Sequence, residues 1–212
     1  MRTALVTGAS RGIGRAIAEE LARDHHIHAG ASQDAGEVVD KLGSASPFEV
    51  DLRDPAAIRE AAAGIDELDV LVHAAGLYPK GSFAELDDAH FRDAFEVNVF
   101  AGIELTRALV PALRRSGGLL ITINSGAGFH GVEEGTAYCA TKFALRGFTE
   151  ALRLEEKGRI RVTSLHPGRT DTDMIAADER AKMPPQAVAK AARLAVDAAA
   201  MGATVEFLRI AP

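Results

Sequence analysis

Short apolar runs alternate with amphipathic stretches along this chain. Seven mainly apolar runs predict strands: Thr3–Val6, His26–Ala31, Phe48–Val50, Leu68–Ala74, Leu119–Asn124, Ile160–His166 and Thr204–Ile210. Six intervening stretches carry apolar residues at helical spacing: Gly12–Arg23, Gly36–Leu42, Pro55–Ala63, Ala89–Leu113, Ala137–Glu156 and Gln186–Ala200. Strands that alternate with helices join by right-handed crossovers into a parallel sheet covered on both faces. The pattern therefore predicts one doubly wound α/β domain over residues 1–212, with ligands bound just after the strands.

Composition limits the kinds of partner. A formal net charge of −6 disfavours nucleic acid and anionic membrane surfaces. No apolar run approaches the ~20 residues that a membrane span needs, so we predict neither partner. The single cysteine, Cys139, excludes an internal disulfide and fits a reducing compartment. Because Met1 leads into a strand without room for a signal peptide, we predict a cytoplasmic protein.

The stretch "VTGASRGIGRA", from Val6 to Ala16, joins the first strand to the first helix. Its glycines, Gly8, Gly12 and Gly14, allow the backbone to come close to a ligand. The helix that follows presents unpaired N–H groups and a partial positive charge, which suits a phosphate. The spacing differs from the common G-x-G-x-x-G pattern, so a glycine turn without a ligand remains an alternative.

Polar residues follow the fifth strand, where Ser125 ends "INS" and "YCATK" opens a long helix. Tyr138 and Lys142 are four residues apart and share one helical face. A tyrosine with a pKa near 10 is a poor acid–base group at neutral pH, and a nearby ammonium group would lower that pKa. An ordinary surface pair is the alternative when this spacing is taken alone.

Taken together, these motifs resemble the short-chain dehydrogenase/reductase family, in its compact single-domain branch. The matching positions are Thr7-Gly8-x-x-x-Gly12-x-Gly14, Ser125 and Tyr138-x-x-x-Lys142, with "VDL" at 50–52, "HAAG" at 73–76, "VNV" at 97–99 and "HPGRTDT" at 166–172. The resemblance extends from Thr3 to about Ile210. It implies a Rossmann fold and an oxidoreductase that moves a hydride between a nicotinamide cofactor and a small carbonyl or alcohol substrate.

The resemblance also implies a role for each matching residue. Tyr138 would be the acid–base, with Ser125 bonded to the same substrate oxygen. Lys142 would lower the tyrosine pKa and hold the ribose hydroxyls, and Asn98 would position a water that leads protons to Lys142. The implied cofactor-binding residues are Gly8, Ser10, Arg11, Gly12, Ile13, Gly14, Ser32, Asp51, Leu52, Ala75, Gly76, Tyr138, Lys142, Pro167, Gly168 and Thr170.

Cofactor choice depends on the end of the second strand. Ser32 stands where the family usually carries an aspartate for NAD or an arginine for NADP. Arg11, just before Gly12, could pair with a 2′-phosphate, and the Ser32 hydroxyl could donate to it. The sequence therefore predicts NADP(H) over NAD(H), with NAD(H) possible if Asp34 binds the ribose instead.

Two features depart from the family pattern, and two others have no functional role in our interpretation. Ala74 replaces an asparagine that usually braces the sheet, and the substrate loop, at about 172–185, is short. His26 and His28 have no third ligand at suitable spacing, so we predict no metal site. We interpret Glu155 and Glu156 as a solvated helix end.

The long predicted helices carry Phe95, Val99, Phe143 and Phe148 in addition to core-facing positions, and members of the family that the chain resembles commonly pair these helices with their copies. We therefore expect a homodimer or a larger homo-oligomer. Two rival functions remain open. One is a catalytically idle cofactor-binding protein, which is disfavoured by the presence of Asn98, Ser125, Tyr138 and Lys142. The other is a nucleotide-sugar epimerase, disfavoured by the glycine spacing and the lack of a larger C-terminal domain.

Overall fold

A computed structural model describes residues 1–211, and it contains every predicted strand and helical stretch. The strands are β1 (Arg2–Val6), β2 (His25–Ala31), β3 (Ala45–Glu49), β4 (Val70–His73), β5 (Leu119–Ile123), β6 (Arg161–Pro167) and β7 (Phe207–Ile210). The helices are α1 (Gly12–Leu21), α2 (Gly36–Leu42), α3 (Pro55–Ala62), α4 (Asp88–Phe95), α5 (Ala101–Ser116), α6 (Thr136–Glu155) and α7 (Pro185–Ala200). Shorter helical segments are the π-helix η1 (Glu96–Phe100) and the 3₁₀ turns η2 (Gly126–Gly128) and η3 (Asp173–Ile175).

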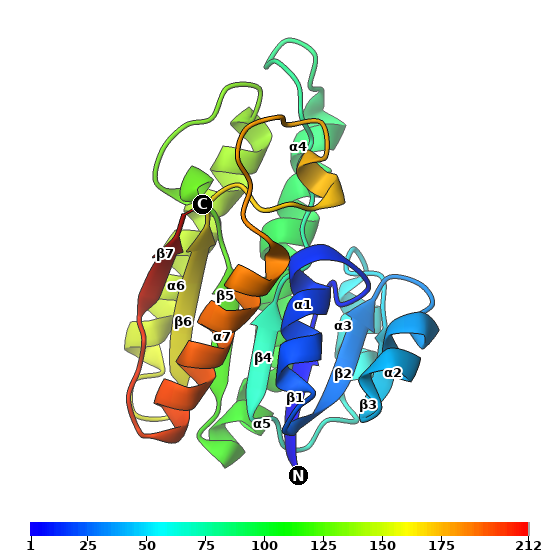
Figure 1. The fold of residues 1–212 in the computed structure, drawn as a ribbon, viewed down its shortest axis with the longest axis vertical. Helices are drawn as coiled ribbons and strands as arrows, with labels where there is room; N and C mark the ends of the chain where they lie inside the picture. Colours follow the sequence, from blue (N-terminus) through cyan, green and yellow to red (C-terminus); the bar gives the residue numbers. More distant parts are fainter. Residues whose placement is uncertain (212) are drawn as a thin grey trace.

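The strands form one parallel sheet in the order β3-β2-β1-β4-β5-β6-β7, which confirms the predicted fold class. The chain moves outward in one direction from β1 to β3 and then returns to start the other half at β4. This reversal opens a crevice between the carboxyl ends of β1 and β4, the usual ligand position in such sheets. All seven strands end at the upper edge in Figure 1.

Two layers of helices cover the sheet, and each layer encloses its own apolar cluster. On one face α1 and α7 lie side by side, in front of the sheet in Figure 1, around Ile17, Leu21 and Val188. On the other face α3 and α5 pack around Ile58, Leu105 and Leu109. The near-continuous apolar strands are therefore buried on both sides, as parallel strands require.

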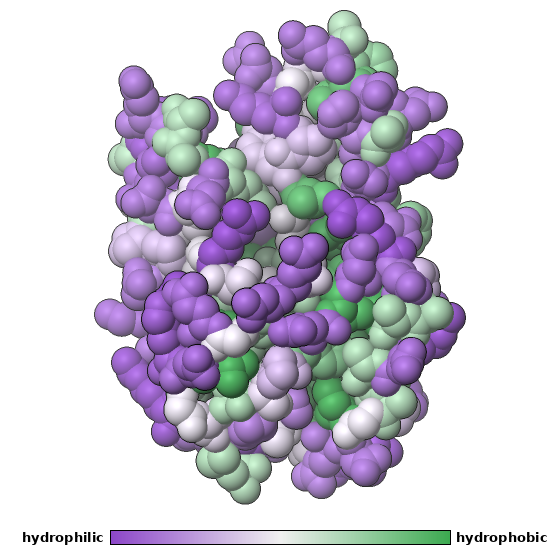
Figure 2. All heavy atoms as spheres, turned by 90° about the vertical axis from the view of Figure 1, so that its right-hand side faces the viewer, coloured by the Kyte–Doolittle hydropathy of each residue, from purple (hydrophilic) through white to green (hydrophobic). Residues whose placement is uncertain are grey.

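The sheet edge near β3 faces the viewer in Figure 2, where hydrophilic side chains dominate and apolar atoms show mainly between them. The sequence places the start of β3 at Phe48, whereas the strand begins at Ala45. Pro47 lies inside it and cannot donate a ladder hydrogen bond. An edge position tolerates this loss, and within residues 1–211 β3 pairs only with β2.

The long helix expected over Ala89–Leu113 is interrupted. Between α4 and α5, the N–H of Ala101 donates to the carbonyl of Glu96, five residues back, which makes η1 a π-helix. Short π-helices inside α-helices are frequent at functional sites. The periodicity of the apolar residues continues through the segment, so the sequence pattern does not reveal it.

Glu156 is not part of a solvated helix end, and that interpretation was wrong. Its side chain is only 7% exposed, and its carboxylate accepts from Arg114 Nε at 2.9 Å and Nη2 at 2.5 Å. The guanidinium of Arg114 keeps the pKa of Glu156 below its usual range. The pair joins α5 to the end of α6, and a buried carboxylate is tolerated because its charge is compensated.

Candidate active site

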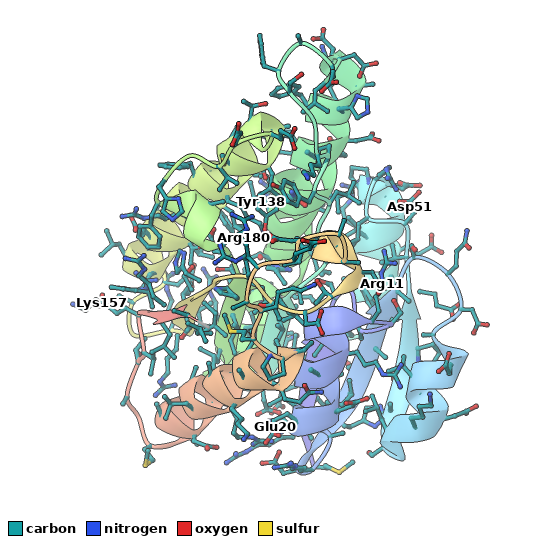
Figure 3. The ribbon with its side chains drawn as sticks, turned by 45° about the horizontal axis from the view of Figure 1, so that its top comes forward. Arg11, Glu20, Asp51, Tyr138, Lys157 and Arg180 are labelled. Carbon is teal, nitrogen blue, oxygen red and sulfur yellow. The ribbon has the colours of Figure 1, made fainter. Side chains whose placement is uncertain are left out.

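Two adjoining hollows open at the carboxyl ends of the strands. One, of about 250 Å³, lies over β1, β2 and β4, and the other, of about 530 Å³, lies over β5 and β6. They share a wall that includes Ile13, Gly76, Thr172 and Met174. Figure 3 shows Arg11 and Asp51 near the first hollow and Tyr138 with Arg180 near the second. After the roles that the sequence analysis expects of their lining residues, we call them the nucleotide hollow and the catalytic cavity.

Glycine residues bring three backbone segments close together at the nucleotide hollow. Gly8 has φ +65°, and a Cβ built on it would lie 2.9 Å from the Cα of Ala75. A Cβ on Gly14 would overlap the carbonyl of Gly8. Thr7 completes the junction, because its Oγ1 accepts from the backbone N–H groups of Ala74 and Ala75, at 3.0 and 3.1 Å. A backbone cradle at the start of α1 fits the phosphates of a dinucleotide.

Most of the predicted cofactor residues line one hollow or the other. The nucleotide hollow is lined by Gly8, Arg11, Gly12, Ile13, Gly14, Ser32, Asp51, Leu52, Ala75 and Gly76. The catalytic cavity is lined by Ile13, Gly76, Tyr138, Lys142, Pro167, Gly168 and Thr170. Ser10 lines neither hollow and is exposed.

The charged groups around the nucleotide hollow include one that the sequence analysis missed. Arg53 lines it and lies 3.6 Å from Asp51, while Arg11 lies 3.6 Å from Asp173. Asp34 does not line the hollow, and its carboxylate instead accepts from the N–H of Gly36 at the start of α2.

Ser125 and Tyr138 meet at the catalytic cavity, as their positions after β5 and at the start of α6 predict. The Ser125 carbonyl contacts Nδ1 of His166 at 3.2 Å, and its N–H donates to Oδ1 of Asn124 at 2.8 Å. Tyr78 stacks on Tyr138 with ring centroids 4.5 Å apart. The side chain of Ser125 is itself held by the N–H of Ala127, which donates to Ser125 Oγ at 3.1 Å.

Burial controls the acidity of this group of residues. Desolvation raises the pKa of Tyr138 to about 12, and the hydrogen bond with Ser125 offsets only part of that rise. Desolvation also lowers the pKa of Lys142 to about 8. Its Nζ donates to the carbonyl of Ile123 at 2.9 Å and lies 5.4 Å from the centre of the Tyr138 ring. The expected lowering of the tyrosine pKa by Lys142 is not found, because desolvation raises this pKa and the opposing effect comes from Ser125.

Asn98 lies in η1, behind the cavity rather than on its wall. Its Oδ1 accepts from the N–H of Leu77 at 2.7 Å, and its Nδ2 donates to the Leu77 carbonyl at 2.9 Å and to Thr141 Oγ1 at 3.0 Å. The side chain thereby ties the segment after β4 to α6.

Arg180 and Asp178 also line the catalytic cavity, and the sequence analysis gave them no role. They lie in the expected substrate loop, where no motif singles them out. Among residues 1–211 there is no group of three or more histidine, cysteine, aspartate or glutamate side chains that could hold a metal ion. None of the described helices is long and apolar enough to cross a membrane.

The family model for short chain dehydrogenases matches residues 2–183. The chain belongs to this family. A curated member, the 3-oxoacyl-[acyl-carrier-protein] reductase FabG of Escherichia coli, is 36% identical over 193 residues, which cover 85% of this chain and 79% of the relative.

Solved structures of short-chain dehydrogenases share the fold closely. A candidate NAD(P)-dependent gluconate 5-dehydrogenase from Beutenbergia cavernae, solved with NADP at low occupancy, has a TM-score of 0.89 and 35% identity, covering 98% of this chain and 94% of its own. An alcohol dehydrogenase from Thermococcus sibiricus, in complex with 5-hydroxy-NADP, has a TM-score of 0.87 and 27% identity, covering 99% and 96%. The chain is thus similar to oxidoreductases that bind nicotinamide cofactors.

Proposed function

We propose that this protein is an NADP(H)-dependent reductase of a small carbonyl compound, with Tyr138 as the proton donor. The observation that carries the proposal is the meeting of Ser125, Tyr138 and Lys142 in one cavity that adjoins a glycine-lined hollow. A bound nicotinamide would supply the hydride that reduces the carbonyl carbon. The whole of residues 1–212 would act as one cofactor-binding domain with a short substrate loop at about 172–185.

The chain's own residues handle the proton and the charge. Tyr138 carries its proton at neutral pH. It can give this proton to the carbonyl oxygen because hydride addition turns that oxygen into an alkoxide, a stronger base than a phenolate. Ser125 donates a second hydrogen bond to the same oxygen, which stabilises the negative charge that develops there. Lys142 would hold the ribose hydroxyls, and Asn98, through Leu77 and Thr141, would keep α6 aligned with the end of β4.

The cofactor would lie across both hollows. The phosphates would bind at the loop of Gly8, Gly12 and Gly14, since Gly8 and Gly14 let the backbone pack closely there and the start of α1 presents free N–H groups. Arg11 and Ser32 would contact the 2′-phosphate. The other contacts would come from Ser10, Ile13, Asp51, Leu52, Ala75, Gly76, Tyr138, Lys142, Pro167, Gly168 and Thr170.

The remaining proposals concern assembly and location. Phe100 of η1 and Phe143 of α6 are 52% and 46% exposed, which suits pairing with a second copy. Val99, which the sequence analysis counted as surplus, is buried instead. A cytoplasmic homo-oligomer that binds neither nucleic acid nor membranes stays our expectation.

Replacing Tyr138 tests the proposed chemistry. Tyr138→Phe removes the hydroxyl with little change in shape, so turnover of NADPH with carbonyl substrates should fall by about 10²–10⁴. The measurement is the loss of NADPH absorbance over a panel of aldehydes and ketones, with NADPH affinity titrated in parallel. More than a tenth of the wild-type turnover in this variant would contradict the role of Tyr138.

A further inference from the structure

The loop that closes the catalytic cavity holds one guanidinium in a fixed orientation. The loop is tied at its base by hydrogen bonds from Asp171 N–H to the Met183 carbonyl, at 2.8 Å, and from Met183 N–H to the Arg169 carbonyl, at 2.9 Å. Within it, Asp178 Oδ1 accepts from the backbone N–H of Arg180 at 3.0 Å. The position of Arg180 is therefore set close to the anchored end of the loop.

Asp178 also holds the side chain of Arg180 through two parallel hydrogen bonds. Nε donates to Oδ1 at 2.9 Å and Nη2 donates to Oδ2 at 2.6 Å. Asp178 is only 17% exposed, whereas Arg180 is 67% exposed and can be reached from the cavity. Across residues 1–211, Nη1 of Arg180 donates no hydrogen bond, so the outer edge formed by Nη1 and Nη2 is available to a ligand.

This edge lies near the reacting groups. Arg180 and Tyr138 line the same cavity and lie close together in the view of Figure 3. The charge of Arg180 also acts on the hydroxyl of Tyr78, the residue stacked on Tyr138. The charged groups that line the cavity are Lys142, Arg169 and Arg180 against Glu133 and Asp178. Three positive groups thus stand against two negative ones, an excess of one positive charge.

We propose that the substrate carries a carboxylate besides its carbonyl or alcohol group, and that Arg180 binds this carboxylate through Nη1 and Nη2. The proposal rests on the proposed function and names its substrate class. A guanidinium can bind one carboxylate side-on and another end-on, and two-pronged pairing with a planar anion is its strongest mode. Asp178 then acts as the positioning residue, since it fixes the direction of the free edge.

Matched pairs of compounds test the substrate class. Purified protein with NADPH is offered pyruvate, acetoacetate and levulinate, each beside its methyl ester, and kcat/KM is measured for every compound. For at least one pair we expect the acid to exceed the ester by about tenfold or more, which corresponds to ~1.4 kcal/mol of binding. Arg180→Gln should lower this acid-to-ester ratio by about the same factor, mainly through KM for the acid.

Two further variants test whether the acid-to-ester ratio depends on the guanidinium group of Arg180 or only on positive charge. Arg180→Lys keeps the charge but loses the two-pronged geometry. Its acid-to-ester ratio should therefore lie between those of Arg180→Gln and the wild type. Lys157→Gln removes one positive charge far from the cavity, at an exposed position labelled in Figure 3, and should leave the ratio unchanged.

The possible failures differ in meaning. Esters used as well as acids by the wild type, or a ratio that Arg180→Gln leaves unchanged, overturn this proposal and leave the proposed function intact. Turnover of no carbonyl compound, acid or ester, in this panel and in the neutral panel above overturns the proposed function, and this inference with it.

Discussion

The nucleotide hollow and the catalytic cavity share a wall but are built from different parts of the chain. The nucleotide hollow depends on backbone: Gly8 and Gly14 are needed because segments approach so closely that no side chain fits. The catalytic cavity depends on side chains such as Tyr138 and Lys142, whose acidity is set by burial. A backbone site is therefore recognisable from residue spacing, whereas the chemistry of a side-chain site depends on surroundings that spacing does not reveal.

The largest expected effect is a loss of folding stability at Gly8, which tests the role of the backbone in the nucleotide hollow. Gly8 and Gly117 have nearly the same φ, +65° and +64°, but only Gly8 has neighbours within reach of a Cβ. Gly117→Ala should cost about 1–2 kcal/mol of folding stability from the left-handed conformation alone. Gly8→Ala should cost a further ~1–3 kcal/mol from overpacking against Ala75.

Chemical denaturation of the two variants, together with an NADPH titration, measures this difference. Gly8→Ala should also weaken NADPH binding, because relief of the clash shifts the loop, while Gly117→Ala should bind the cofactor normally. Equal stability losses in the two variants would show that close approach at Gly8 is unimportant.

The next effect concerns a buried side chain. His73, at the end of β4, is 7% exposed, and its Nε2 lies 2.8 Å from Thr106 Oγ1. Burial lowers its pKa from 6.5 to about 4, so the unfolded chain binds a proton more readily than the folded one. The stability that neutral His73 contributes is complete above about pH 6.5 and is lost as the pH falls towards 4, up to ~3 kcal/mol in all.

Unfolding free energies measured from about pH 7 to about pH 4 test this linkage, because this range spans the two pKa values of His73. His73→Asn should flatten the pH dependence. His130→Gln, at an exposed histidine, should leave it as in the wild type. An unchanged slope in His73→Asn would mean that other groups dominate the acid sensitivity.

The smallest effect concerns cofactor choice. If Arg11 binds the 2′-phosphate, the wild type should bind NADPH more tightly than NADH by about 1.5–3 kcal/mol, the range for hydrogen bonds to charged groups. Arg11→Ala should remove most of this preference and barely change NADH binding.

Arg53→Ala is the matched variant, since Arg53 lines the same hollow but lies beside Asp51. Titration of both cofactors against the three proteins decides between the two arginines. Loss of the preference only in Arg53→Ala would transfer the role to Arg53, and tighter NADH binding by the wild type would contradict both.

The sequence was informative wherever a local pattern determines the outcome. Continuous apolar runs located the strands, and the four-residue spacing of Tyr138 and Lys142 brought both to one cavity. The sequence analysis failed where contacts between residues far apart in the sequence determine the structure. Glu156 is buried because Arg114 of another helix compensates its charge. Likewise, nothing adjacent to Arg180 in the sequence indicates that its guanidinium reaches the cavity beside Tyr138.

If Arg11 leaves Asp173 to bind a cofactor, the wall between the two hollows would make their ligands thermodynamically dependent on each other. Thr172 and Met174 border both spaces, Asp173 pairs with Arg11 on one side, and Arg180 follows a few residues later on the other. A cofactor that draws Arg11 away from Asp173 changes the free energy of the segment that also bounds the substrate. By reciprocity, whatever factor the cofactor applies to substrate affinity, the substrate must apply to cofactor affinity. Neither dissociation constant would then be a property of one hollow alone.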